Sequence, residues 1–127
     1  MIIQLSNNYK SVENNLRTDE EIKHFIDQHS KIFRRAPYNV EKIRNMQEIE
    51  EFKNISVFKN DVMIANILLH VEVTGVNKYG WVEDLFVDKE HRRLGIADYL
   101  MDKAFEHFKE IGLNESRLEA WSSNRRA

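Results

Sequence analysis

The sequence predicts one α/β domain whose elements follow the order β-α-α-β-β-β-α-β. Three segments carry apolar residues at the three- and four-residue spacing of amphipathic helices. Shorter segments between and around them alternate apolar and polar residues or form brief apolar runs, which is typical of strands. The length of 127 residues fits a single domain, and the chain contains no internal repeat or linker-like stretch.

Composition narrows the class of protein. The chain has no cysteine, which excludes disulfides, thiolate metal sites and a cysteine nucleophile. The formal net charge of -2 argues against a nucleic-acid partner. No apolar run approaches the roughly 20 residues that span a bilayer, and the first residues lack the basic stretch of a signal peptide. We therefore expect a soluble, cytoplasmic protein that binds neither nucleic acid nor membrane and holds no metal.

The first part of the chain predicts a strand and two helices. Residues 1–5 form a short apolar run that can open a sheet. Thr18 and Glu21 have the spacing of a capping box, and apolar residues follow at helical spacing. Pro37 ends this helix because proline does not fit a helix interior. Asn39 is a candidate N-cap of the second helix.

The centre of the chain predicts a hairpin. Residues 55–58 favour a strand and residues 59–61 a tight turn. The long strand expected at residues 63–73 has one fully apolar face, made of its odd-numbered residues. Its even-numbered residues, among them Ile64 and His70, form a mixed face.

The remaining elements are a turn at residues 75–80, a strand at 81–87, a helix at 96–111 and a short strand at 118–121. Gly112 is placed as the C-cap glycine of the helix. The inward residues expected on this helix are Ala97, Leu100, Met101, Ala104, Phe105, Phe108 and Ile111.

The segment between the strand at 81–87 and the following helix carries the clearest functional signal. A strand that runs into a glycine-containing turn and a helix N-terminus presents unpaired backbone N–H groups and the positive end of a helix dipole. Gly95 permits close approach of a phosphate, and Arg92 and Arg93 add positive charge. His91 is expected to be solvated. These residues alone fit either a phosphate site or an ordinary loop with a solvated basic patch.

The spacing of Arg92, Gly95 and Ala97 matches Q/R-x-x-G-x-G/A, the signature of the GCN5-related N-acetyltransferase (GNAT) family. Downstream, Asn124 and Ala127 stand where that family has its N-x-x-A motif. The strand before the signature and the helix after it have the expected lengths, so a little more than the last third of the chain resembles this family.

The resemblance implies a mixed, twisted sheet with helices on both faces, splayed between the strands that end at Val87 and at Trp121. Acetyl-CoA lies in that splay as the co-substrate. Backbone groups of the strand that ends at Val87 pair with the pantetheine arm, and amides of the loop after this strand hold the pyrophosphate. The cofactor-binding residues that the resemblance implies are Leu85, Phe86, Val87, Arg92, Arg93, Leu94, Gly95, Ile96, Ala97 and Asn124.

The implied reaction is direct attack of an amine on the thioester, which needs a base and a donor to the oxyanion. The resemblance implies the backbone N–H of Val87 as the oxyanion donor. Glu83 is the first candidate for the base, and Asp84 is expected on the opposite face because strand side chains alternate. His70 and Glu119 are alternatives for the base. Asp84, His70 and Glu119 are also candidates for binding the acceptor.

The acid of this family is usually a tyrosine on the helix after the N-x-x-A motif, and the sequence ends at Ala127. Tyr99 lies on a different helix and does not replace it. We therefore expect residues 1–127 to be a single N-acetyltransferase domain that lacks the family's last helix and last two strands. The strand at 118–121 would then have an open edge at which a second copy can form a homodimer.

Two functions are compatible with these features. The first is an acetyltransferase that acts on a primary amine of a small molecule or a peptide, and acidic residues such as Glu83 favour a cationic acceptor. The second is a catalytically weak or inactive CoA-binding domain with a regulatory or structural role. A helix-turn-helix DNA-binding role fits poorly, because the helix at 96–111 uses its inner face for apolar packing.

Overall fold

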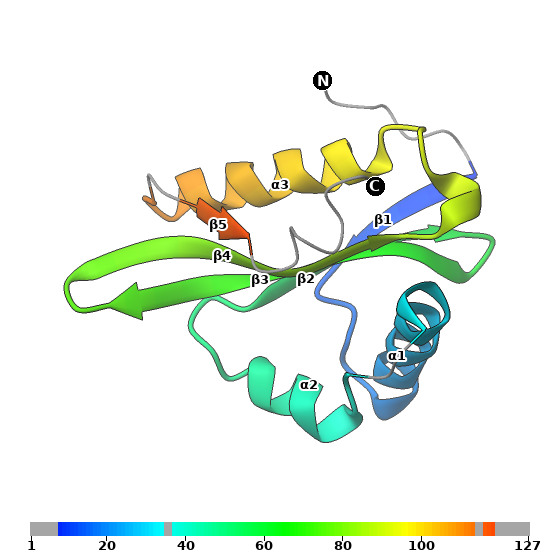
Figure 1. The fold of residues 1–127 in the computed structure, drawn as a ribbon, viewed down its shortest axis with the longest axis horizontal. Coiled ribbons are helices and arrows are strands. Elements are labelled where there is room, and N and C mark those ends of the chain that lie inside the picture. The colour runs from blue at the N-terminus through cyan, green and yellow to red at the C-terminus, as the bar shows by residue number, and fades with distance from the viewer. Residues whose placement is uncertain (1–7, 35–36, 114–115, 119–127) are drawn as a thin grey trace.

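A five-stranded sheet with helices on both faces forms the framework of the protein (Figure 1). This computed structural model describes residues 8–34, 37–113 and 116–118. The elements in chain order are β1 (Tyr9–Glu13), α1 (Asp19–Phe33), α2 (Val40–Met46), β2 (Lys53–Lys59), β3 (Val62–Thr74), β4 (Asn77–Val87), the 3-10 helix η1 (Lys89–His91), α3 (Ile96–Glu110) and β5 (Ser116–Leu118). This order confirms the predicted alternation of strands and helices.

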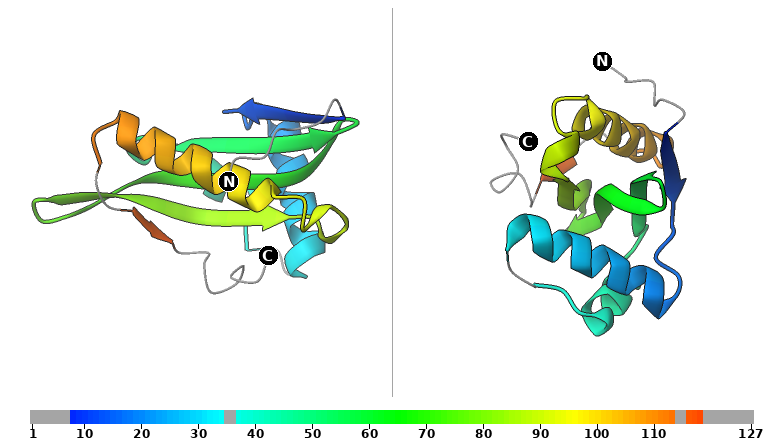
Figure 2. Two further views of the ribbon diagram at one scale, coloured as in Figure 1. Left: turned by 90° about the horizontal axis from the view of Figure 1, so that it is seen from above. Right: turned by 90° about the vertical axis from the view of Figure 1, so that its right-hand side faces the viewer.

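The strands lie in the order β1-β2-β3-β4-β5. The first four pair antiparallel with their neighbours, and β5 pairs parallel with β4. Helix α3 packs on one face of the sheet and α1 and α2 pack on the other, as the end view of Figure 2 shows. The mixed sheet with helices on both faces confirms the predicted fold class.

Both predicted helix starts are confirmed. The Thr18 hydroxyl accepts the N–H of Glu21 at 3.1 Å, and the Glu21 carboxylate accepts the N–H of Thr18 at 2.9 Å, which completes the capping box. The backbone bond from Thr18 lowers the pKa of Glu21. The side chain of Asn39 accepts the N–H of Lys42 at 2.8 Å and begins α2.

The first strand differs from the prediction. The apolar run at residues 1–5 lies outside the described residues, whereas β1 begins at Tyr9 and pairs with β2 from Tyr9–Lys59 to Glu13–Ile55. The sequence Tyr-Lys-Ser-Val-Glu shows little apolar alternation because β1 is half-buried and, among the described strands, pairs only with β2.

The two faces of β3 also differ from strict alternation. Met63 packs against α1 and α2, whereas Ala65 packs against α3. The pairing passes from Val57–Ala65 to Phe58–Met63, so Ile64 is the extra residue of a bulge and joins the α3 side. The prediction that all odd-numbered residues of this strand share one face is therefore wrong.

Polar residues on the α1 side of the sheet are buried and form hydrogen bonds with one another. Asn54, Ser56 and Asn66 lie side by side on β2 and β3. The side chain of Asn15 accepts hydrogen bonds from Nδ2 of Asn54 at 2.7 Å and from the Ser56 hydroxyl at 2.8 Å. This cluster ties the segment before α1 to the centre of the sheet.

Two tight hairpins join the central strands. Asn60 and Asp61 both have positive φ, 50° and 68°, as a two-residue type I′ turn requires, which confirms the predicted turn. The next turn is shorter than predicted. It consists of Gly75 and Val76 alone, with Gly75 at φ 63°, so β4 starts at Asn77 rather than at residue 81. The resulting long hairpin extends past the end of α3 (Figure 1).

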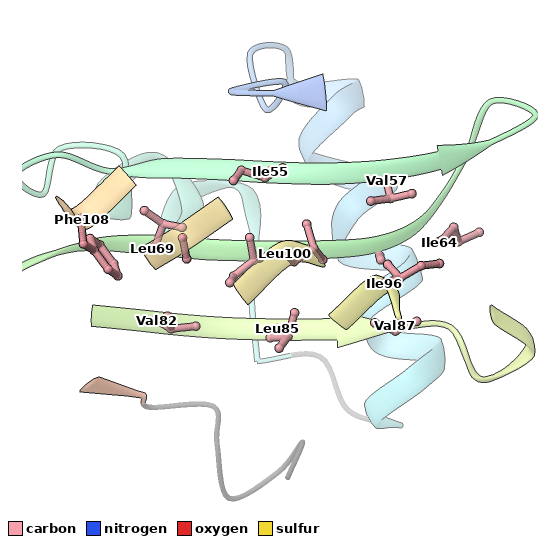
Figure 3. Packing of buried hydrophobic residues seen from close by; sticks show 13 residues of the cluster. Ile55, Val57, Ile64, Leu69, Val82, Leu85, Val87, Ile96, Leu100 and Phe108 are labelled. Atoms are coloured by element: carbon pink, nitrogen blue, oxygen red, sulfur yellow. The ribbon is translucent and has the colours of Figure 1, made fainter. Parts of the chain in front are cut away.

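Helix α3 supplies one side of the main core. Ile96, Leu100, Ala104 and Phe108 are buried against β2, β3 and β4 (Figure 3). The prediction for Phe105 is wrong, since 41% of this residue is exposed. It follows Ala104 directly and therefore lies about 100° around the helix from the buried row.

The C-terminus of α3 has the predicted glycine. Gly112 has φ 87° and donates to the carbonyl of Lys109 at 3.0 Å, and Leu113 donates to the carbonyl of Phe108 at 2.8 Å. These two bonds form a Schellman motif. The chain then returns to β5, which begins at Ser116, and the rest of the strand expected at 118–121 lies outside the described residues.

No helix in the described part of the chain is long and apolar enough to cross a membrane.

A candidate anion site and an adjoining acidic pocket

The N-terminus of α3 is open to a ligand. Gly95 is its N-cap with φ 81°, and no side chain caps the first turn. The first helical hydrogen bond runs from the N–H of Tyr99 to the carbonyl of Gly95 at 2.9 Å, so the three intervening N–H groups have no partner within the helix. Arg93 also has positive φ, 66°, which helps the loop turn its amides toward one point.

A cavity of about 280 Å³ lies at this helix end. Its lining residues are Val87, His91, Arg92, Arg93, Gly95, Ile96, Ala97 and Asp98. The GNAT resemblance implies residues 92–97 for the pyrophosphate. Five of these six residues therefore line one cavity, and Leu94 does not. The Leu94 side chain is 45% exposed and does not line the cavity. His91 and Asp98 line it but were not among the predicted residues.

Two side chains fix the loop in place. Nε of Arg92 donates to the carbonyl of Val87 at 3.0 Å, which leaves the rest of the guanidinium for the cavity. Nδ1 of His91 lies 2.9 Å from the hydroxyl of Tyr9, and the two rings meet edge to face. The expectation that His91 is solvated is therefore wrong, because β1, which the sequence did not predict, packs against it.

The edge of β4 next to β5 is open near this cavity. The N–H of Asp88 donates to the carbonyl of Ile64 at 2.7 Å. Because backbone groups alternate in direction along an antiparallel strand, Leu85 and Val87 turn theirs away from β3. Among the described residues, β5 pairs with β4 only over Gly80, Trp81 and Val82.

Phe86 behaves differently from its two neighbours. Its backbone faces β3 by the same alternation, and its side chain is fully buried against Phe25. The implied cofactor contact of Phe86 is therefore not supported by its position, whereas the N–H groups of Leu85 and Val87 face the open edge and the Val87 carbonyl is held by Arg92.

A second cavity, of about 340 Å³, lies on the α2 side of β4. Its lining residues are Pro37, Tyr38, Lys42, Asn45, Met46, Ile49 and Glu83. We call it the acidic pocket after Glu83, the one carboxylate that lines it among the described residues.

A bulge turns Glu83 into this pocket. The pairing of β3 with β4 passes from Leu68–Asp84 to Leu69–Val82, so Glu83 is the extra residue. The alternation of side chains is thus interrupted. Asp84 bonds to Tyr38, which also lines the acidic pocket with Glu83, so the expectation that the two carboxylates lie on opposite faces is wrong.

Two ring nitrogens hold the Glu83 carboxylate. Nε1 of Trp81 lies 3.1 Å and Nε2 of His70 lies 3.2 Å from the same oxygen, Oε1. Nδ1 of His70 lies 3.2 Å from Oε2 of Glu72. Burial acts to lower the pKa of His70, but the hydrogen bond to Glu83 and the charges of both carboxylates outweigh it, so the pKa is raised.

Asp84 is a buried structural group. Its Oδ2 accepts hydrogen bonds from Nε2 of His29 at 2.8 Å and from the hydroxyl of Tyr38 at 2.6 Å. His29 has helical spacing with apolar residues, so its pattern does not distinguish it from a core residue. Asp84 is only 7% exposed, which removes it from direct contact with an acceptor.

Two predicted residues, Glu119 and Asn124, lie outside the described residues. Within the described part of the chain, no cluster of three or more His, Asp or Glu side chains is arranged to hold a metal ion.

The sequence matches the acetyltransferase (GNAT) family over residues 19–127. No curated protein sequence matches the chain significantly.

Solved structures with a similar fold include an aminoglycoside acetyltransferase from an uncultured soil metagenomic sample, in complex with sisomicin. It has a TM-score of 0.73 and 16% identity, over 90% of this chain and 78% of that one. An aminoglycoside N-acetyltransferase in complex with CoA has a TM-score of 0.71 and 11% identity, over 98% and 84%. A ribosomal-protein-alanine N-acetyltransferase from Brucella melitensis has a TM-score of 0.70 and 13% identity, over 94% and 87%.

Proposed function

Because the chain belongs to the acetyltransferase (GNAT) family, we propose that it transfers the acetyl group of acetyl-CoA to a primary amine of a small molecule or peptide by direct attack. One arrangement carries this proposal. The uncapped N-terminus of α3 lies in a cavity that Val87 of β4 also lines, and the open edge of β4 leads from Val87 toward Glu83. Val87 and Glu83 are four residues apart on this strand, a span of about 13 Å. The same proposal treats residues 1–127 as one catalytic domain.

The anion site suits the pyrophosphate of acetyl-CoA. The free N–H groups of Ile96 and Ala97 and the dipole of α3 attract negative charge, and Arg92 and Arg93 add cationic donors. A helix N-terminus with two arginines at its mouth is a stronger anion site than either feature alone.

The open edge of β4 suits the pantetheine arm and the thioester. An extended chain that carries amides can pair with the outward-facing N–H groups of Leu85 and Val87 as an added strand would. The same N–H groups can donate to the oxyanion that forms during attack. The family resemblance implies Val87 for this donor, and Leu85 lies two residues nearer to Glu83 along the strand.

Glu83 suits the role of the base. It lines the acidic pocket, its side chain is 28% exposed, and both of its hydrogen bonds within the described residues reach Oε1, which leaves Oε2 for the acceptor. The acceptor enters as an ammonium ion and loses a proton to Glu83. The free amine attacks the thioester carbon, and the C–N bond forms in a tetrahedral intermediate that still carries an extra proton on nitrogen. The C–S bond then breaks, and this proton passes to the departing thiolate, which leaves the amide and CoA thiol.

The acidic pocket favours a cationic, partly apolar acceptor. Glu83 supplies the negative charge, Met46 and Ile49 supply apolar wall, and Lys42 is held by a bond from Nζ to the carbonyl of Pro37 at 3.1 Å. Two structural neighbours are described as acting on aminoglycosides and one on a ribosomal-protein alanine, all of which are amines.

The test is a thiol-release assay with acetyl-CoA and a panel of aminoglycosides, polyamines and N-terminal peptides, with the acetylated product identified by mass. We expect acceptor-dependent release of thiol and a gain of one acetyl group. Saturable binding of acetyl-CoA without transfer to any amine would instead support a CoA-binding domain with a regulatory or structural role. Absence of both binding and transfer would contradict both functions.

A further inference from the structure

Three side chains form a row across β3 and β4 on the side of the acidic pocket. His70 lies in the middle, with Glu72 Oε2 at 3.2 Å from Nδ1 and Glu83 Oε1 at 3.2 Å from Nε2. The His70 side chain is 1% exposed, whereas the two carboxylates are 40% and 28% exposed. The imidazole is therefore buried between two carboxylates, each of which is partly exposed to solvent.

Both ring nitrogens of His70 face acceptors. A carboxylate only accepts hydrogen bonds, and a neutral imidazole has one N–H and one lone pair. A neutral His70 would thus turn a lone pair either toward Glu83 or toward the side of Nδ1, where the Val71 carbonyl lies at 3.4 Å and Glu72 at 3.2 Å. The imidazolium donates from Nε2 to Glu83 and from Nδ1 to the Val71 carbonyl while it forms an ion pair with Glu72, and the raised pKa of His70 agrees with this geometry.

No other ionisable group within the described residues competes for this ring. Glu72 lies on the same strand as His70 and Glu83 lies on β4. Lys42 of α2, which lines the acidic pocket, donates to the Pro37 carbonyl instead.

We propose that His70 is a positioning residue of the transfer reaction, which fixes Oε1 of Glu83 so that Oε2 faces the acceptor. This inference rests on the proposed function and goes beyond it, because His70 neither touches the acceptor nor takes its proton. Trp81 holds the same oxygen from the other side at 3.1 Å. The two donors fix the rotation of the carboxylate, which sits on a bulge and lacks the support of regular strand neighbours.

We call the two donors that hold Oε1 of Glu83, His70 and Trp81, the clamp. Its hold on Glu83 depends on pH through His70. When His70 loses its proton, one of its two bonds is lost. If Glu83 is released, the carboxylate is free to rotate and transfer slows. Activity should therefore fall on the alkaline side through titration of His70. Glu72 favours the imidazolium by its charge, so Glu72→Gln should move the alkaline fall to lower pH.

The experiment compares the parent with His70→Gln, Glu72→Gln and, as a control, His107→Gln on the distant helix α3. We expect His70→Gln to lower kcat roughly 10- to 100-fold, within the range of a misplaced base, with unchanged KM for acetyl-CoA and without the alkaline fall. Glu72→Gln should keep most of kcat and shift the fall, and His107→Gln should match the parent. Identical pH profiles for the parent, His70→Gln and Glu72→Gln would overturn the proposal.

A second measurement separates this inference from the proposed function. The ring of His70 is titrated by NMR in the parent, Glu72→Gln and Glu83→Gln. The clamp predicts that the pKa of His70 falls in both variants. If no transfer activity is found, the proposed function fails. If Glu83→Gln leaves the pKa of His70 unchanged, this result contradicts the clamp itself, whatever the activity.

Discussion

The hydroxyl of Tyr38 donates to Oδ2 of Asp84 at 2.6 Å and thereby fastens the segment before α2 to strand β4. His29 donates to the same oxygen from α1, so one buried carboxylate joins both helices to the sheet. Asp84 follows Glu83 directly and Tyr38 lines the acidic pocket, so this junction holds two neighbouring parts of the pocket wall in place.

Tyr38→Phe should loosen that junction. Removal of the hydroxyl leaves Asp84 with one of its two donors, and the expected loss of stability is about 1–2 kcal/mol. The KM of the acceptor should rise more than the KM of acetyl-CoA, because Tyr38 lines the acidic pocket and not the anion site. The matched control is Tyr99→Phe, whose hydroxyl has no hydrogen bond in the described part of the chain. Equal effects of the two substitutions in urea denaturation and steady-state kinetics would refute the assignment.

Gly80→Ala should destabilise the fold by about 1–3 kcal/mol. A Cβ atom at this position would lie 2.5 Å from the ring of Phe108, so the helix or the ring must shift. Chemical denaturation of Gly80→Ala, Phe108→Leu and the double mutant forms a thermodynamic cycle. We expect the double mutant to lose less stability than the sum of the single losses. Simple additivity would mean that the two residues are not in contact.

Glu83→Gln should lower kcat about 10²- to 10⁴-fold at neutral pH, because the amide keeps the shape of the side chain but does not accept a proton. The affinity for acetyl-CoA should not change. Glu106→Gln, on the exposed side of α3, is the control for loss of one negative charge. An unchanged rate for Glu83→Gln across a pH series would move the role of base to His70, Glu119 or water.

Stability should fall as pH rises through the titration of His70. Its pKa in the folded protein is raised above the ordinary value of 6.5, so the folded protein binds the proton more tightly than the unfolded chain does. The corresponding stabilisation is fully present below pH 6.5 and is lost as pH rises through the folded pKa. Urea midpoints measured from pH 5 to 9 should show this decline in the parent and a flatter profile in His70→Gln. The same slope in both proteins would show that another group titrates.

Local signals in the sequence predicted much of the fold. Thr18 and Glu21, Asn39 and Gly112 act through neighbours three or four residues away, so their roles follow from spacing alone. The bulges at Ile64 and Glu83 depend on how β3 meets its two partners, and periodicity within one strand does not encode them.

In the candidate site, too, local features were predicted and contacts between distant parts of the chain were not. The loop at Arg92, Gly95 and Ala97 was predicted from its residues and lies together in the structure. The roles of His29 and of Glu72 were missed, because each depends on a contact with a distant or cross-strand group. Asp84 was assigned to the wrong face for the same reason, since a single extra residue reverses the alternation.

The most direct test of acetyl-CoA binding at the N-terminus of α3 is calorimetric titration of the parent, Gly95→Glu, Gly95→Ala and Leu94→Glu. Gly95→Ala carries the strain of positive φ without the charge, and Leu94→Glu adds the same charge on an exposed side chain outside the cavity. We predict one acetyl-CoA bound per chain in the parent, near-parental affinity for Leu94→Glu, and affinity at least ~100-fold weaker for Gly95→Glu than for Gly95→Ala, a loss of about 2.8 kcal/mol. Binding by Gly95→Glu as tight as that of the parent would contradict the account.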